Sequence, residues 1–133
     1  MTTHDSKILL FRNTMRITDG HLESFREVIA RAIAFAERHG PQLMVETFVD
    51  EERMLAHSFQ LYQDSDAVRL HWKLADPYIQ DVMKHCQVER FEVFGTPDPD
   101  VTAGIRSALS EESALTFSPR IAGFVRFATG LHP

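Results

Sequence analysis

The chain has 133 residues, of which 44% are hydrophobic and 25% are charged. That length fits one compact domain with its own core, and the composition argues against a disordered or fibrous chain. The net charge of −5 comes from 14 basic and 19 acidic residues that are scattered along the chain, so no concentrated basic surface for nucleic acid is expected.

Membrane and disulfide classes are also disfavoured. The longest apolar runs, such as ILLF, are too short to cross a bilayer, and the start MTTHDSK lacks the regions of a signal peptide. A cytoplasmic protein without a membrane partner is therefore predicted. Cys86 is the single cysteine, so it forms no internal disulfide and is expected to be a small buried hydrophobic residue.

The first half of the chain predicts a strand, a helix and two strands. Residues 7–15 are apolar and compatible with a β-strand, and from Gly20 the apolar residues recur at i, i+3 and i+4 over about five turns of helix. Thr18 or Asp19 can cap that helix, and Gly40 followed by Pro41 ends it. Residues 43–49 and 55–63 then predict two strands, which the acidic DEER at 50–53 joins as a hairpin.

Alternation in the third strand separates two sets of side chains. Leu55, His57, Phe59 and Leu61 share one face, and Ala56, Ser58, Gln60 and Tyr62 share the other. Helical spacing returns over residues 65–87, where Pro77 is expected to break or kink the helix into 65–75 and 77–87. Residues 88–95 predict a fourth strand.

This order, β-α-β-β-α-β, predicts an α+β, ferredoxin-like core over residues 7–95, an antiparallel sheet with both helices on one face. In three of the four strands both alternating sets carry large apolar residues, whereas a sheet with one wet face alternates more cleanly. The open face therefore needs a cover, and a second copy of the chain is the simplest one, which predicts a homodimer.

Residues 96–133 exceed this minimal fold. Apolar spacing predicts a short helix near residues 101–109, which Gly104 weakens, and RIAGFVRF at 120–127 predicts a short fifth strand. This extension is expected to pack on the sheet edge or to reach across to a partner.

The helix over residues 65–75 carries the residue of greatest chemical interest. Ala67, Leu70, His71 and Leu74 fall at i, i+3, i+4 and i+7, so His71 is expected to face the sheet. Trp72 lies about 100° further round the helix, at the flank of that stripe. Two interpretations stay open: His71 is a hydrogen-bonded core histidine, or it works in a pocket.

The stretch LYQDSDAVRLHW, in which a strand ends in Tyr and a short acidic turn leads to Ala-x-x-x-His, resembles the second half of the antibiotic biosynthesis monooxygenase family of dimeric α+β barrels. KILLFRNTMRITDGHLESFREVI resembles its first half, so the likeness covers residues 7–95. The histidine of the family pattern falls on His71. The chain departs from the family at KLADPYIQ, where Pro77 and Tyr78 stand further along than the family's proline and second pocket residue.

The resemblance implies small homodimers whose pockets lie between sheet and helices. The enzymes among them oxygenate quinols, anthrones and related phenols without flavin, haem or metal, while other members isomerise small metabolites or degrade haem. A cofactor-independent monooxygenase acting on a small aromatic substrate is thus the leading hypothesis. The alternative is a non-catalytic dimeric barrel that binds a small hydrophobic metabolite or serves as an interaction scaffold, and haem degradation is a distant third.

Such oxygenation needs a base, hydrogen-bond donors for an oxyanion and a dry pocket. His71 is the candidate base, because the pKa of histidine lies near neutral pH. The candidate hydrogen-bond donors are Asn13, Tyr62 and Tyr78, and the candidate pocket walls are Trp72, Phe11 and Phe59. His57 shares a strand face with Phe59 and is a further pocket candidate.

Two questions about these candidates stay open. Either Asn13 or Arg12 can face the helices, because neighbouring residues of a strand point to opposite faces. A metal centre built from His57, His71 and Glu46 matches no ligand motif, so no metal and no cofactor are expected.

Overall fold

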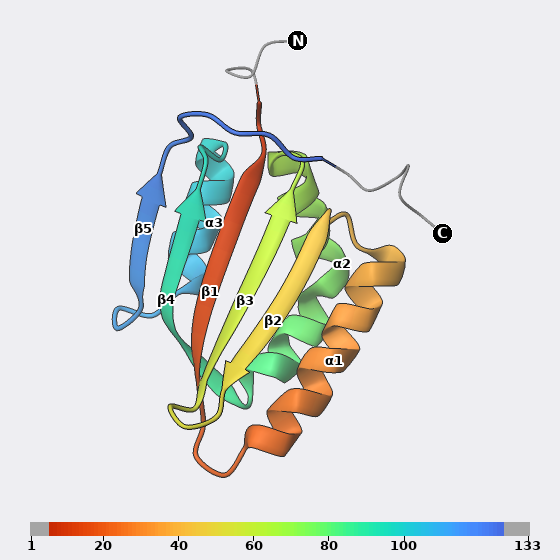
Figure 1. Cartoon of the computed structure of the whole chain (residues 1–133), viewed down its shortest axis with the longest axis vertical. Helices are drawn as coiled ribbons and strands as arrows, with labels where there is room; N and C mark the ends of the chain where they lie inside the picture. The colour runs from red at the N-terminus through yellow and green to blue at the C-terminus, as the bar shows by residue number, and fades with distance from the viewer. Residues whose placement is uncertain (1–5, 127–133) are drawn as a thin grey trace.

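The computed structural model describes residues 6–126. Its elements in chain order are β1 (Leu9–Ile17), α1 (Leu22–His39), β2 (Met44–Asp50), β3 (Leu55–Tyr62), α2 (Ser65–Met83), β4 (Cys86–Phe94), α3 (Pro99–Ala108) and β5 (Ala114–Ser118). The first six confirm the predicted order, and α3 and β5 form the extension (Figure 1).

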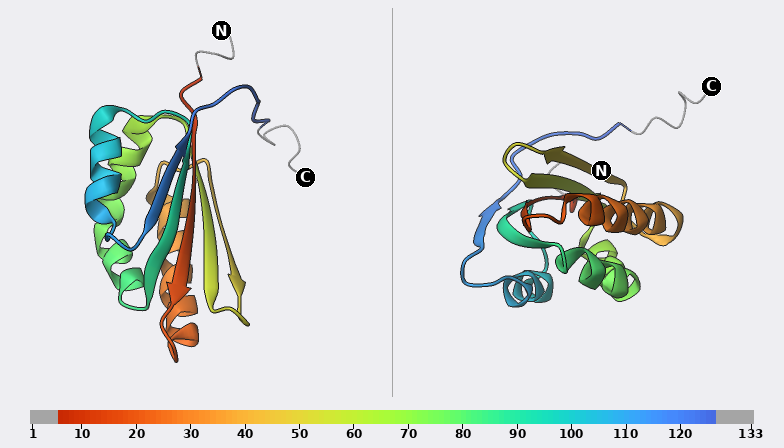
Figure 2. Two further views of the ribbon diagram at one scale, coloured as in Figure 1. Left: turned by 90° about the vertical axis from the view of Figure 1, so that its left-hand side faces the viewer. Right: turned by 90° about the horizontal axis from the view of Figure 1, so that it is seen from below.

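The five strands form one mixed sheet in the order β2-β3-β1-β4-β5, antiparallel except where β5 pairs with β4 in parallel. A parallel neighbour cannot be joined by a tight hairpin, so α3 serves as the crossover between β4 and β5. All three helices lie on one side of the sheet, and the segment after β5 runs toward the other side (Figure 2). The α+β prediction is confirmed, and within residues 6–126 the sheet is open and not closed into a barrel.

The core between sheet and helices is divided into two hydrophobic clusters. One contains Leu9 and Phe11 from the start of β1, and the other contains Met15 and Ile17 from its end. Asn13 lies between these pairs, and it is the polar residue among the inward positions of the strand. A polar side chain at the centre of a core strand needs a partner or a cavity, so the break between the clusters marks a candidate site.

Helix α2 differs from the prediction in two ways. It is not divided at Pro77: the helix runs without a break from Ser65 to Met83, and Pro77 is exposed. The helix ends at Met83, and β4 begins at Cys86, two residues earlier than predicted. Cys86 is buried, as expected.

The predicted cap of α1 is wrong, because the helix begins at Leu22 after His21, and no side chain caps it. The predicted fifth strand is also misplaced. β5 occupies Ala114–Ser118, where Leu115 and Phe117 pack against the first core cluster, and residues 120–126 form no strand; Phe127 lies outside the described residues. The expected short helix is confirmed as α3.

The segment at residues 119–125 returns over the open face of the sheet. Together with Leu10, Leu61 and Phe94 it lines a hollow of about 320 Å³. Among the described residues, no helix is long and apolar enough to span a membrane.

Candidate functional site

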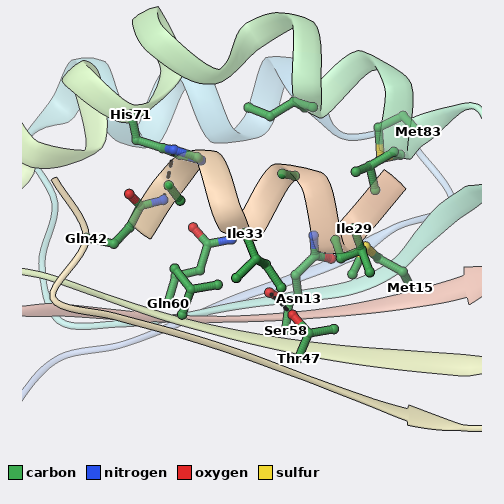
Figure 3. Close-up of a pocket in the computed structure, with 15 residues that line it drawn as sticks. Asn13, Met15, Ile29, Ile33, Gln42, Thr47, Ser58, Gln60, His71 and Met83 are labelled. Carbon is green, nitrogen blue, oxygen red and sulfur yellow. Dashed lines mark hydrogen bonds between the residues drawn. The ribbon is translucent and has the colours of Figure 1, made fainter. Parts of the chain in front are cut away.

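Two adjoining cavities lie between the sheet and the helices, at the break between the two core clusters. Figure 3 shows the residues that line the smaller one. One measures about 110 Å³ and the other about 200 Å³. Both are lined by Asn13, Gln60, His71, Ile79 and Met83, so these five residues stand at their common boundary. We treat the cavities as two lobes of one chamber.

The two lobes differ in their walls. The smaller, which we call the aliphatic lobe, is closed by Ile29, Ala32, Ile33 and Ala36 of α1, with Val45 of β2 and Val82 of α2. The larger, the aromatic lobe, is closed by Phe11, Tyr62, Trp72, Phe91, Ile105 and Leu109. The last two come from α3 and the residue that caps it, so the extension supplies part of the chamber wall.

His71 reaches the chamber from α2, as predicted, although the stripe that carries it differs from the predicted one. Leu70 and Leu74 are 44% and 37% exposed, while Val68, Ala75 and Val82 are buried. The inward stripe is therefore turned by one residue, and His71 and Trp72 both lie on it. Burial lowers the pKa of His71 to about 4, so its imidazole is neutral at neutral pH.

Gln42, in the turn between α1 and β2, fixes the orientation of the His71 ring. Its amide Nε2 lies 2.9 Å from Nδ1 of His71 (Figure 3). Its Oε1 is buried, and no group in the described part of the chain bonds to it. An amide can present either end to an imidazole nitrogen. With Nε2 there, His71 carries its proton on Nε2 and donates to a ligand; with Oε1 there, the proton sits on Nδ1 and Nε2 is a base.

Asn13 answers the first open question, because it lines both lobes and Arg12 does not. Its Oδ1 is buried and has no hydrogen-bond partner among residues 6–126. Arg12 lies on the open face, with its guanidinium 5.5 Å from the ring centre of Phe59 and its Nε 3.7 Å from Glu92. The acceptor of Asn13 is thus left for a ligand.

Tyr62 ends β3 and is fully buried, with its ring centre 5.1 Å from that of Phe11 and 6.0 Å from that of His71. Its hydroxyl donates to Oε1 of Gln60, which leaves the NH₂ group of Gln60 for a ligand. Burial raises the pKa of Tyr62, so the phenol stays protonated. Tyr62 therefore orients Gln60 and forms a wall.

Trp72 closes the aromatic lobe against α3. Its ring packs on Gly104 so closely that a Cβ added there would lie 2.7 Å from Cζ3. The glycine that weakens α3 as a helix therefore lets the indole approach the backbone. Trp72 and Phe11 lie where the sequence predicted pocket walls.

Three predicted residues lie elsewhere. Phe59 and His57 belong to the set of β3 side chains on the open face, because the smaller set with Ser58 and Gln60 faces the helices. Tyr78 lies on the far side of α2 and stacks on Phe35 of α1, with ring centres 4.4 Å apart. None of the three lines either lobe.

The chamber lacks charge. The lining side chains of both lobes are apolar, hydroxyl, amide or aromatic, apart from His71, which is neutral. Within residues 6–126, no three His, Cys, Asp or Glu side chains gather as possible metal ligands, and Glu46 is exposed on β2. An uncharged ligand suits such a lining, because a buried charge would have no counter-ion.

Sequence reasoning missed Gln42 and Gln60. Gln60 shares its strand face with Tyr62, so the alternation of β3 could have found it. Gln42 has no such signal, because it lies in a turn and approaches His71 through the packing of α1 on α2.

No family model and no curated protein sequence matches the chain. Solved structures do match. MupZ from Pseudomonas fluorescens is 16% identical with a TM-score of 0.68, over 90% of this chain and 95% of that one. SnoaB from Streptomyces nogalater, a cofactor-independent oxygenase, is 18% identical with a TM-score of 0.58, over 70% of this chain and 96% of that one.

A protein from Caulobacter crescentus CB15 that is assigned to the antibiotic biosynthesis monooxygenases is 14% identical, with a TM-score of 0.56 over 65% of this chain and 88% of that one. The chain has the fold of antibiotic biosynthesis monooxygenases. The resemblance predicted from the sequence is confirmed at the level of the fold. The likeness to MupZ covers 90% of the chain, which is more than residues 7–95 contain, whereas the other two structures cover 70% and 65%.

Proposed function

We propose that the protein is a cofactor-independent monooxygenase that acts on a small aromatic quinol or anthrone. One observation carries the proposal: a neutral, inward histidine faces an uncharged chamber beside the unpartnered acceptor of Asn13. The fold shared with SnoaB, a cofactor-independent oxygenase, supports it.

The first step is removal of a proton from the substrate by Nε2 of His71. In the structure, Nε2 of Gln42 lies next to Nδ1 of His71. This step uses the opposite orientation of the amide, in which Oε1 of Gln42 accepts the proton of Nδ1 and the Nε2 lone pair of His71 faces the chamber. The products are an imidazolium and an aromatic oxyanion next to each other. Their attraction offsets the burial that lowers the pKa of His71, and the NH₂ group of Gln60 can donate to the oxyanion.

The second step uses molecular oxygen as the oxidant. The electron-rich anion gives one electron to O₂, and the resulting radicals combine to a carbon–oxygen bond, which forms a peroxide. For an anthrone, loss of water from the peroxide converts the CH₂ carbon into a carbonyl. One oxygen atom stays in the product, the other leaves as water, and His71 supplies the proton for the leaving oxygen.

Oxygen uptake tests this assignment. Purified protein is given a panel of quinols and anthrones, and His71→Gln is compared with the unchanged chain. Glutamine keeps an acceptor for Gln42 but cannot take up a proton, so we expect kcat to fall by roughly 10²–10⁴. His57→Gln, on the opposite face of the sheet, is the matched control and should keep kcat within about threefold.

Full activity in His71→Gln would remove His71 as the base. A uniform lack of oxygen uptake across the panel, together with measurable binding of the same compounds, would favour the non-catalytic binding protein. That second candidate draws on a specific observation, since Tyr62 is already paired with Gln60 and His71 with Gln42, as in a chamber built only to hold a ligand.

We also propose that the protein forms a homodimer through the open face of the sheet. Phe48 and Phe94 are 56% and 37% exposed there, and the ring of Phe48 meets that of Phe59 edge-on. Large apolar side chains on an exposed sheet face are typical of an interface between copies. The cytoplasmic location expected from the sequence stays a prediction.

A further inference from the structure

We infer that the chamber takes an uncharged ligand made of an aromatic ring and an aliphatic chain, with a hydroxyl or carbonyl oxygen at the point where the two parts join. This inference deepens the proposed function, because it names the class of substrate that the same site would take. It rests on how the two lobes differ and on what stands between them.

The first argument is size. Pockets for drug-sized ligands begin at roughly 300 Å³. The aliphatic lobe measures about 110 Å³ and the aromatic lobe about 200 Å³, so each alone is smaller than that. A ligand that fills the chamber must therefore occupy both lobes and pass the boundary that Asn13, Gln60 and His71 form.

The second argument is shape. Phe, Tyr and Trp side chains line only the larger of the two lobes, together with aliphatic ones, and a flat ring can pack there against the faces and edges of Phe11 and Trp72. One wall of the smaller lobe is a helix face of small and branched aliphatic side chains, from Ile29 to Ala36, and the hydroxyls of Thr47 and Ser58 belong to the strands that also line it. A saturated chain gains binding free energy in such a space from the apolar area that it buries, and it needs no particular orientation there.

The third argument is the position of the polar groups. The unpartnered Oδ1 of Asn13, the NH₂ end of Gln60 and the free ring nitrogen of His71 all belong to residues shared by both lobes. An oxygen at the far end of the aromatic lobe would be buried without them, at the cost of an unmade hydrogen bond. In the aliphatic lobe the hydroxyls of Thr47 and Ser58 already bond to each other, and Gln42 lies beside His71. The ligand oxygen is therefore placed at the junction of ring and chain.

Positional isomers of butylphenol test this placement. In 2-butylphenol the hydroxyl adjoins the chain, and in 4-butylphenol it lies at the opposite end of the ring, while size and apolar area stay the same. Trp72 is the single tryptophan of the chain and lines the aromatic lobe, so its fluorescence reports binding. We expect 2-butylphenol to bind roughly fivefold more tightly, the gain that one additional hydrogen bond provides.

Two variants locate the parts of the ligand. Ala32→Leu fills the aliphatic lobe, so it should remove most of the affinity that 2-butylphenol has over phenol while phenol itself binds within twofold of the unchanged chain. Asn13→Leu removes the acceptor at the boundary and should abolish the preference between the isomers. Ala36→Leu, one turn further along α1, repeats the first test if Ala32→Leu does not fold.

Equal affinity for the two isomers, or equal weakening of phenol and 2-butylphenol in both lobe-filling variants, would overturn the inference. The titrations are run without oxygen, so they do not depend on turnover. If the isomers differ as expected but no quinol is oxidised, the proposed function fails and the inference stands. If quinols are oxidised while the isomers bind equally, the inference alone fails.

Discussion

The two faces of the sheet are built for different tasks. The face under the helices carries small and polar side chains at its centre, with Asn13 on β1 and Ser58 and Gln60 on β3, and a chamber lies above them. The open face carries Phe48, Phe59 and other large apolar side chains, and no helix of residues 6–126 lies over it (Figure 2). The covered face thus leaves a chamber where a continuous core could stand, and the open face keeps large apolar side chains exposed although residues 119–125 return over part of it.

The largest expected effect concerns the open face. Phe48→Arg should cost little within one chain, because Phe48 is 56% exposed, but in a symmetric dimer it places two like charges in an apolar interface. We expect the dimer dissociation constant to rise by a factor of roughly 100 or more. Sedimentation equilibrium measures it.

Leu74→Arg is the matched control for this prediction, since Leu74 is an exposed leucine of α2 in the helix layer. It should leave association unchanged. An unchanged dissociation constant in Phe48→Arg, or a monomeric unchanged chain, would remove the contrast between the two faces as we describe it.

The second effect concerns the covered face and its neutral histidine. The pKa of His71 is about 4 in the folded chain and near 6.5 in an unfolded one, so between these values the unfolded chain binds more protons. The contribution of His71 to the free energy of unfolding is therefore complete above pH 6.5 and is lost as the pH falls toward 4. From pH 7 to pH 5 this loss amounts to about 2 kcal/mol.

Urea unfolding at pH 7 and pH 5, for the unchanged chain and for His71→Gln, isolates this contribution. From pH 7 to pH 5, the free energy of unfolding of His71→Gln should fall by about 2 kcal/mol less than that of the unchanged chain, whatever the stability of the variant at pH 7. Between pH 7 and pH 8 the two proteins should change in parallel. An identical loss in both proteins would mean that His71 is not held neutral by its surroundings.

The same contrast explains which parts of the molecule the sequence predicts. Element order follows from periodicity, so the sheet, both long helices and α3 were predictable. The orientation of β3 was not, because the usual rule assigns the more apolar set to the core. Here Phe59 lies on the open face and Gln60 in the chamber, which is the arrangement that the proposed ligand site and the proposed dimer interface would need.

His71 was placed correctly for a partly wrong reason. The predicted stripe used Leu70 and Leu74, which are exposed, and the true stripe uses Val68 and Ala75. Because the two stripes overlap at position 71, the inward direction was the same. Contacts that depend on packing between elements, such as Gln42 with His71, could not be read from spacing at all.

The smallest effect tests whether the extension belongs to the chamber wall. Replacing glycine by alanine inside a helix normally stabilises it by about 1 kcal/mol. At Gly104 the new methyl group would lie 2.7 Å from the rigid ring of Trp72, so the ring or α3 must move. We expect Gly104→Ala to lower the free energy of unfolding by about 1 kcal/mol in urea denaturation, because strain from overpacking exceeds the helix gain.

Position 103 provides the internal reference for this last comparison, because Ala103 is exposed on the same helix. Ala103→Gly should also lower stability by about 1 kcal/mol, so alanine is preferred at 103 and glycine at 104. If alanine were preferred at both positions, α3 would tolerate displacement from Trp72. The ferredoxin-like core alone would then determine the shape of the aromatic lobe, and the extension would stabilise only the edge of the sheet, through β5.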